Sequence, residues 1–422
     1  MRKILFILCG LFLALQAMAQ EEFRQDGMIF KLYTTQNGIH HAELVGNFLP
    51  NGTDFVQIPD SLTKKGAKYP VTVIGEKAFK WKYGLDTVII PDCVTTIGED
   101  AFSGCEDLTK MTIPNSVTTI GKCAFIGCKG LTTLNIPASV TTIGESAVQY
   151  CHGLKALYVP GTVTTVGEYA FADCRGLTSL TLSDSITEIF KSEFAGCRGL
   201  TTLNIPASVT TIGQKAFLDC RGLTSVTIPN SVTKIEMEAF AECKSLSTVT
   251  IPTSITEISA GVFRDCHGLT SVNIPHTVTE IGNGAFYNCR SLTTLTLSNS
   301  ITRLGMNAFY GCSGLEKIYY NTNDPVAGVK TIFSDDVYKK ATVYVPFGCR
   351  DKAYAIYPWL NFEKIVETDF SGINDVDAAS SLSNRVEVYD LRGVKVADTV
   401  DGLSSGIYIV RRGADVEKIA VR

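Results

Sequence analysis

The sequence predicts a repeat solenoid, mainly β with short helical turns, of about 11 coils of 23 residues. The first observation is that ten of the 14 cysteines recur every 23 residues, from Cys105 to Cys312. The second is that leucine, phenylalanine and proline series keep the same interval, the leucines without a break from Leu85 to Leu315. Such a period indicates that one small unit is stacked many times, because a single unit cannot bury its own apolar face.

One coil, LTTLNIPASVTTIGESAVQYC, shows the elements expected in each unit. Leu134 and Ile136 alternate with polar residues, which predicts a short half-buried strand. Pro137 ends that strand, because proline has no N–H for the ladder. Val140 and Ile143 predict a second extended segment that points inward. The Ala-Phe-x-x-Cys stretch of most coils predicts a single helical turn whose three named residues face the core.

The first 19 residues predict an export signal. Arg2 and Lys3 precede an apolar run over residues 4–15, which is too short to span a bilayer, and Ala-Met-Ala at 17–19 fits a cleavage site. The mature chain is therefore expected to begin at Gln20. No later stretch predicts a transmembrane helix. The formal net charge of −4 for the whole chain argues against a nucleic-acid partner, which would need a positive field.

The two ends of the predicted solenoid differ from the coils, as caps must, because an open end would leave a row of backbone groups unpaired. A hairpin is expected between 30–33 and 39–45, around a Thr-Thr-Gln-Asn-Gly turn. The expected units are a signal peptide (1–19), an N-terminal β cap (20–73), the solenoid (74–320), a C-terminal cap (321–367), a linker (368–384) and a small β-sandwich-like domain (385–422). An aromatic plug is expected in the second cap, formed by Tyr354, Tyr357, Trp359, Phe362 and Ile365.

The repeat I-G-x-x-A-F-x-x-C-x-x-L-T-x-L-x-I-P-x-S-V-T resembles the BspA-like leucine-rich repeat family. It is seen best in IGKCAFIGCKGLTTLNIPASVTT and IGQKAFLDCRGLTSVTIPNSVTK, which begin at Ile120 and Ile212. The resemblance implies a leucine-rich-repeat-like solenoid on a secreted or surface-exposed bacterial protein with a role in adhesion. The segments VEVYDLRGVKV, LSSGIYIVRRG and EKIAVR resemble a type IX secretion sorting domain, which implies that machinery as a partner.

The ten spaced cysteines are expected to be buried free thiols. Stacked positions have parallel Cβ vectors about 4.8 Å apart, whereas disulfides need Cβ atoms about 3.8 Å apart and turned toward each other. Each coil offers one cysteine, while a metal site needs several converging ligands. Cys93, Cys123 and Cys349 lie outside the series, and a local pair of Cys123 with Cys128 stays open. No metal and no cofactor is expected.

Two surfaces are candidate binding sites. The first is a cationic stripe at the position after each spaced cysteine, for which a ligand-binding role and a role as a merely solvated turn both stay open. The stripe consists of Lys129, His152, Arg175, Arg198, Arg221, Lys244, His267 and Arg290. The second is an outward strand face rich in hydroxyl and amide groups, where a binding role competes with the simple strand preference of threonine. The strand face includes Thr133, Asn135, Tyr158, Thr181, Thr202, Asn204, Thr227, Thr250, Asn273 and Thr296.

Enzyme motifs are weak. The Gly-Leu-Ser-Ser-Gly sequence at 402–406 matches a nucleophile pattern, but a strand follows it and the last histidine is His276, far upstream. The expected function is therefore binding, by an exported adhesin-like protein that recognises an extracellular protein or glycan through many weak contacts. A self-associating cell-surface component and a glycan-capture protein for nutrient uptake remain alternatives. The glycan alternative predicts aromatic platforms on the strand face, and only Tyr158 and Tyr319 stand there.

Overall fold

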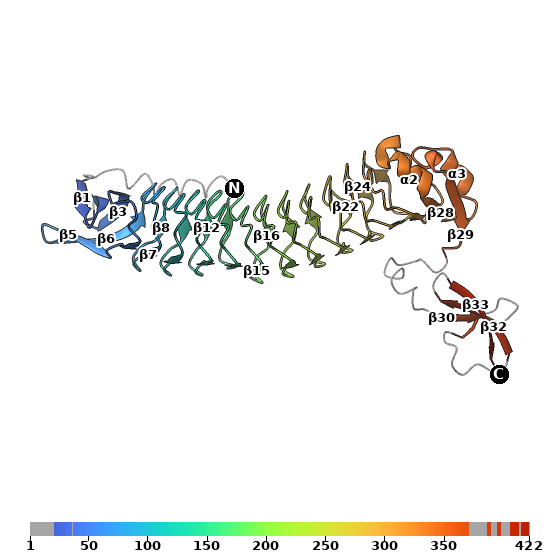
Figure 1. Cartoon of the computed structure of the whole chain (residues 1–422), viewed down its shortest axis with the longest axis horizontal. Coiled ribbons are helices and arrows are strands. Elements are labelled where there is room, and N and C mark those ends of the chain that lie inside the picture. The colour runs from blue at the N-terminus through green and yellow to red at the C-terminus, as the bar shows by residue number, and fades with distance from the viewer. Residues whose placement is uncertain are drawn as a thin grey trace.

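A computed structural model of the chain describes residues 21–35, 37–370, 386–389, 395–397, 406–412 and 415–421. The predicted export signal lies outside the described residues, as does the predicted linker apart from its first three positions. The described chain forms a long stack of coils that runs from the strands around β6 to those around β29 (Figure 1). Its longest described helix has six residues, and none of the described helices could cross a bilayer.

One side of the stack is a row of short parallel strands, here called the first strand row. Eleven of them follow one another at intervals of 23 residues, as predicted, and β4, β28 and β29 extend the row at its ends. The row consists of β4 (Phe55–Gln57), β7 (Thr87–Ile89), β9 (Lys110–Thr112), β11 (Thr133–Asn135), β13 (Ala156–Val159), β15 (Ser179–Leu182), β17 (Thr202–Asn204), β19 (Ser225–Thr227), β21 (Thr248–Thr250), β23 (Ser271–Asn273), β25 (Thr294–Leu297), β27 (Lys317–Tyr320), β28 (Thr342–Pro346) and β29 (Lys364–Thr368).

A second strand row follows the proline of each coil, as the inward-pointing Val and Ile pair predicts. Its strands are mostly two residues long and also pair in parallel. They are β6 (Ala67–Ile74), β8 (Thr96–Ile97), β10 (Thr119–Ile120), β12 (Thr142–Ile143), β14 (Thr165–Val166), β16 (Glu188–Ile189), β18 (Thr211–Ile212), β20 (Lys234–Ile235), β22 (Glu257–Ile258), β24 (Glu280–Ile281) and β26 (Arg303–Leu304).

The space between the rows is filled by ladders of identical side chains. The phenylalanine rings of successive coils stack with centroids 5.2 Å apart at Phe79 and Phe102 and 5.9 Å apart at Phe240 and Phe263. The spaced leucines and cysteines are buried beside them. Burial of this repeated apolar surface is the main stabilising contribution, and it exists only because the coils stack.

The Ala-Phe-x-x-Cys stretch forms hydrogen-bonded turns rather than the predicted helical turn. The N–H of Phe102 donates to the carbonyl of Ala124 in the next coil at 2.8 Å, instead of to a residue of its own segment. Between such bonds the backbone adopts positive φ, for example at Ser146 (54°) and Tyr150 (62°). Pairing between coils therefore replaces helical pairing within a coil, which residue periodicity alone does not reveal.

The coil around Phe190 departs from this regularity. Phe190 stands where most coils have glycine, and among the described strands β14 does not pair with β16, nor β15 with β17. The N–H of Phe190 instead donates to the Glu193 carboxylate at 2.8 Å. Glu193 occupies the usual alanine position and is buried. The Glu193 side chain thus supplies an acceptor for the Phe190 N–H at the point where the strand row is interrupted.

The N-terminal end is closed by antiparallel strands. The predicted hairpin is present as β2 (Met28–Thr34) paired with β3 (His40–Asn47), and β3 then pairs in parallel with β6. Two strands were not predicted: β1 (Glu21–Gln25) lies at the outer edge, and β5 (Ser61–Lys64) forms a second hairpin with β6. Lys65 and Gly66 form the turn of that second hairpin, between Lys64 and Ala67.

The C-terminal end combines β28 and β29 with short helices that the sequence did not predict. These are η1 (Lys330–Ile332), α2 (Asp335–Lys340), α3 (Arg350–Tyr354) and η2 (Trp359–Asn361). The predicted aromatic plug is only partly correct: Trp359, Phe362 and Ile365 are buried, whereas Tyr354 and Tyr357 are 40% and 50% exposed. A tyrosine carries a hydroxyl that must stay wet or find a partner, which favours these exposed positions.

Near the C-terminus the described residues form one antiparallel sheet in the order β31-β30-β32-β33. Its strands are β30 (Val386–Tyr389), β31 (Lys395–Ala397), β32 (Gly406–Arg412) and β33 (Asp415–Val421). All four strands lie within the β domain predicted over 385–422. The described strands make a single sheet, whereas the sequence was interpreted as sandwich-like.

Candidate binding surface

The ten spaced cysteines are structural. All are buried, unpaired thiols, and each Sγ–H donates to the carbonyl 26 residues earlier, as from Cys128 to Phe102 at 3.1 Å and from Cys220 to Phe194 at 3.4 Å. Burial raises the pKa of the nine thiols from Cys105 to Cys289, that of Cys105 to about 12. A thiol held protonated in this way is a poor nucleophile and a poor metal ligand. The prediction of buried free thiols is confirmed.

The remaining described cysteines are also unpaired, so Cys123 and Cys128 form no local disulfide. Cys93 is half-buried, and its Sγ–H donates to the carbonyls of Asp60 at 3.0 Å and Val71 at 3.2 Å. Burial raises the pKa of Cys93 and of Cys123. Among the described residues, no group of three or more His, Cys, Asp or Glu side chains is placed to hold a metal ion.

The cationic stripe runs along the turns and is largely occupied by ion pairs. Lys129 lies 2.8 Å from Glu106, Arg175 lies 3.4 Å from Asp173, and Arg198 lies 2.6 Å from Asp219. Arg221 also pairs with Asp219, and His267 lies 3.6 Å from Asp265. His152 bonds the carbonyl of Tyr150 through Nδ1 at 3.0 Å, and burial lowers its pKa. Asp173 and Asp219, each one position before a cysteine, together with Glu106 thus pair with four of the six lysines and arginines of the stripe, and Lys244 and Arg290 make no ion pair among the described residues.

The outward residues of the first strand row form a regular surface, here called the strand face. In β21 the central Val249 is buried and both neighbours, Thr248 and Thr250, are exposed. Parallel pairing places equivalent residues side by side, so that Thr227 stands opposite Thr250, which in turn stands opposite Asn273. Each strand contributes two outward residues, and these form two columns along the stack. From β15 to β25 every residue of both columns is Ser, Thr or Asn. The result is an uncharged surface of short side chains with hydroxyl and amide groups, here called the floor.

Aromatic side chains stand at both ends of that floor. Tyr158 of β13 is 47% exposed at one end. At the other end Tyr319 of β27 stands opposite Tyr344 of β28, with ring centroids 4.8 Å apart and the planes 16° from parallel. Sequence reasoning identified Tyr158 and Tyr319 but missed Tyr344. The 23-residue period is interrupted before β28, so periodicity assigns Tyr344 to no column, and only the strand pairing does so.

The strand face is also free of carboxylates. From β4 to β29 its outward residues include Lys110, Lys317 and Lys364 and no Asp or Glu. None of these three lysines makes an ion pair among the described residues, unlike most of the cationic stripe. The chain as a whole carries a net charge of −4, so its acidic groups are concentrated elsewhere. A face with unpaired cations and no anions favours anionic ligands.

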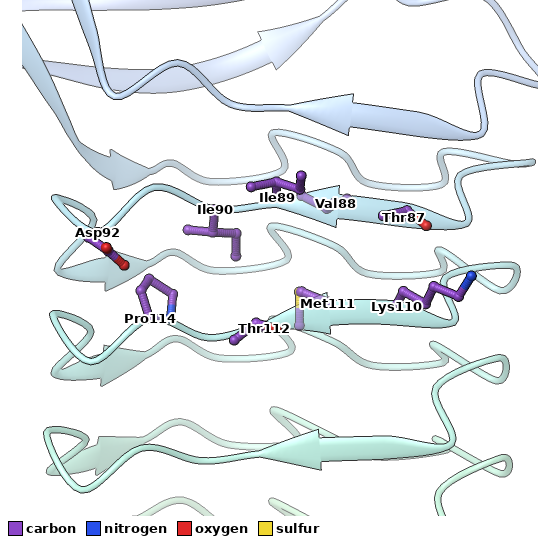
Figure 2. A pocket seen from close by; sticks show the side chains of 9 residues that line it. All are labelled: Thr87, Val88, Ile89, Ile90, Asp92, Lys110, Met111, Thr112 and Pro114. Atoms are coloured by element: carbon purple, nitrogen blue, oxygen red, sulfur yellow. The ribbon is translucent and has the colours of Figure 1, made fainter.

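The N-terminal end of the strand face is more apolar. Figure 2 shows a shallow hollow between β7 and β9, lined among others by Ile89, Lys110 and Met111. Ile89 is 46% exposed, and Phe55 on the preceding strand β4 is 50% exposed. The described strands of this row are interrupted after β9, and the sheet resumes at β11.

The nucleophile-like segment at 402–406 lies outside the described residues except for Gly406, which begins β32.

The family model for the BspA-type leucine-rich repeat region matches residues 72–201 and 187–316. A leucine-rich repeat protein from Bacteroides ovatus is 26% identical with a TM-score of 0.52, and the match covers 82% of this chain and 100% of that one. A leucine-rich cell surface protein from Faecalibacterium prausnitzii is 27% identical with a TM-score of 0.52, over 83% of this chain and 96% of that one. The pneumococcal vaccine antigen PcpA shares the fold at 16% identity and a TM-score of 0.51, over 84% of this chain and all of that one. No curated protein matches the chain.

Proposed function

Because this chain belongs to the BspA-type leucine-rich repeat family, we propose that it is an exported, surface-associated binding protein of the adhesin type. It recognises an extracellular protein or glycan through the strand face of its solenoid. The similar chain from Faecalibacterium prausnitzii is described as a cell surface protein, which supports a location outside the cell. The expected N-terminal export signal supports the same location.

A single observation carries the choice of surface. The strand face presents short polar side chains over many coils, and these side chains form no ion pairs. Most of the charged side chains of the cationic stripe, by contrast, are held in ion pairs. A long surface of hydroxyl and amide groups suits many weak contacts with an extended ligand. Among the described residues no group of three or more His, Cys, Asp or Glu side chains is placed to hold a metal ion, and the ten spaced thiols are buried.

We further propose that residues 385–422 direct the chain to the type IX secretion machinery. The proposal rests on the resemblance of this segment to sorting domains. The sheet β31-β30-β32-β33 supports it, because its described strands pair only with one another and form a unit separate from the solenoid ladders. The sorting role is independent of the binding role.

The binding proposal is tested with two arginines placed on the floor. The double variant Thr227→Arg/Thr250→Arg adds long charged side chains at exposed positions, so a ligand lying on the strand face is displaced. Capture of the full chain on immobilised host matrix extract and on a glycan array is expected to fall at least about tenfold, as expected for loss of central contacts. The matched control is Thr256→Arg, an exposed threonine beside β22 in the other strand row, which should bind as the unaltered chain does.

A second arm tests the stripe. In the triple variant Arg175→Glu/Arg198→Glu/Arg221→Glu the ion pairs with Asp173 and Asp219 are replaced by like charges. If binding is lost in this variant and retained in the threonine double variant, the binding surface is the stripe and the strand-face proposal is wrong. Self-association without any capture from matrix or array would instead support a structural surface component.

A further inference from the structure

Six residues form a compact grid at the C-terminal end of the strand face. In one column Lys317, Thr342 and Lys364 stand opposite one another on β27, β28 and β29. In the next column the same strands place Tyr319 opposite Tyr344, and Val366 completes that column. The two lysines are exposed and the two tyrosines half-buried. Two lysines in one column thus lie beside a stacked pair of tyrosines in the next column, over three adjacent strands.

The tyrosine pair forms a wall at the end of the polar floor. Tyr319 stands opposite Thr296 on the preceding strand, so the last short side chain of the floor adjoins the first aromatic ring. Tyr344 stacks behind Tyr319 at 4.8 Å and holds its ring in place. The ring face of Tyr319 that is turned away from Tyr344 therefore points along the floor, above threonine and asparagine side chains.

The charged side chains closest to this grid are its two lysines and three glutamates nearby. Lys317 and Lys364 make no ion pair among the described residues, and the nearest acidic side chains are engaged or lie off the face. Glu316 pairs with Lys340 at 3.3 Å, and Glu367 accepts from the N–H groups of Gly348 at 2.9 Å and Arg350 at 3.2 Å. Glu363 is exposed one position before β29, outside the two outward columns. Two lysines without an ion pair thus belong to the outward columns, while the nearby carboxylates lie outside them.

We propose that this grid binds an acidic glycan, a polysaccharide that carries uronate carboxylates; the inference rests on the proposed binding function and names its ligand class. A pyranose ring presents a C–H face that packs on an aromatic ring and a rim of hydroxyls that bond to the Thr and Asn floor. Its carboxylate completes the match by pairing with Lys317 or Lys364. A protein ligand would need apolar anchor points, and this part of the face has few beside the two tyrosines.

The test uses the full chain and a panel of oligosaccharides of hyaluronate, galacturonate and alginate, each compared with its carboxyl-reduced form by calorimetry. At least one acidic oligosaccharide is expected to bind, at least about tenfold more tightly than its reduced counterpart at low salt, and to weaken as salt screens the lysines. Lys317→Gln/Lys364→Gln should remove the preference for the acidic form. Tyr319→Ala should weaken both forms, because the stacking surface is lost.

Two matched controls keep the result specific. Lys122→Gln removes an exposed lysine of one turn, and Tyr169→Ala removes an exposed tyrosine of another turn, both outside the strand face. Both lie many coils from the grid and should leave uronate binding unchanged. Circular dichroism confirms that each variant is folded.

Three outcomes would overturn the inference: no binding to any acidic oligosaccharide, equal binding of acidic and reduced forms, or unchanged binding in the lysine and tyrosine variants. If matrix protein is captured and lost in Lys317→Gln/Lys364→Gln while the oligosaccharides do not bind, the partner is an acidic protein and the glycan assignment is wrong. If Thr227→Arg/Thr250→Arg abolishes capture of another ligand, the proposed function stands although the uronate site fails.

Discussion

Side-chain donors that reach the preceding coil recur throughout the molecule. The Sγ–H of Cys151 donates to the carbonyl of Phe125 at 3.2 Å, and the Oγ–H of Ser139 donates to the carbonyl of Val117 at 2.6 Å. Cys93 occupies the position of that serine and makes the same kind of bond. The carbonyl of Phe125 also accepts from the backbone N–H of Cys128 at 3.1 Å, so the thiol supplies a second hydrogen bond to an oxygen with two lone pairs. Small donors at fixed positions thus tie each coil to the one before it.

Glu193 meets the opposite need, an acceptor for a backbone N–H, in an unusual way. Its carboxylate accepts from the N–H of Phe190, but it is buried without a cation beside it. Burial raises the pKa of Glu193 to about 8, and the nearby Glu188 adds to the effect, while the bond from Phe190 opposes it. The side chain therefore supplies a needed acceptor and also introduces a group that resists ionisation in the folded state.

We expect the stability of the chain to fall between about pH 4.5 and pH 8 on account of Glu193. Below this window both states keep the proton, and the contribution is fully present. As pH rises the unfolded chain releases the proton first, and the contribution is lost by about pH 8. Glu193→Gln keeps an acceptor and cannot ionise, so at pH 8 it should be more stable by roughly 3 kcal/mol. Urea unfolding at pH 4 and pH 8 measures the difference.

The matched control is Glu168→Gln, an exposed glutamate that pairs with Lys191 at 2.9 Å. Its substitution should change stability by less than about 1 kcal/mol at either pH. If Glu193→Gln behaves like this control at pH 8, the carboxylate is not the source of the pH dependence.

At the scale of elements, the coils are equivalent and the caps are not. The phenylalanine stack continues past the last regular coil, from Phe309 to Phe333 at 5.5 Å. Trp359 then covers the end: its ring lies 4.8 Å from Tyr320, and its Nε1–H donates to the carbonyl of Val326 at 2.9 Å. Such a cap closes the apolar ladder, which no further coil of the 23-residue type could do without exposing its own face.

Equivalence of the coils predicts that one can be removed. Deletion of residues 222–244 takes out one full period and joins Arg221 to Ser245, so every later residue keeps its face. The shortened chain should unfold cooperatively, within about 10 °C of the parent, because only nearest-neighbour contacts change. Deletion of residues 222–233 removes half a coil and shifts all later apolar residues out of register. Thermal melting of both chains decides this, and equal melting of the two would contradict the nearest-neighbour account.

At the scale of the whole molecule, binding and export are assigned to different parts of the chain. A chain that ends at residue 384 lacks the sheet β31-β30-β32-β33 and keeps the whole strand face. In a Gram-negative host with type IX machinery, the truncated chain should remain in the periplasm while the full chain reaches the surface. Fractionation and protease accessibility of intact cells measure this. The chain lacking residues 222–244 is the control and should be exported, and surface display of the truncated chain would refute the sorting role.

The sequence by itself determined the solenoid, its period, the eleven regular coils and the inward ladders, because stacking repeats one local choice many times. It also identified the strand face and two of its tyrosines. It misjudged places where pairing between coils overrides local pattern: the turns at Ser146, the interruption at Phe190, and the caps. Tyr344 joins Tyr319 only through the strand pairing of β27 with β28. Tertiary structure decided which charges pair across coils, as Arg198 does with Asp219, and hence which face carries cations without an ion pair, since sequence order does not contain the distances between coils.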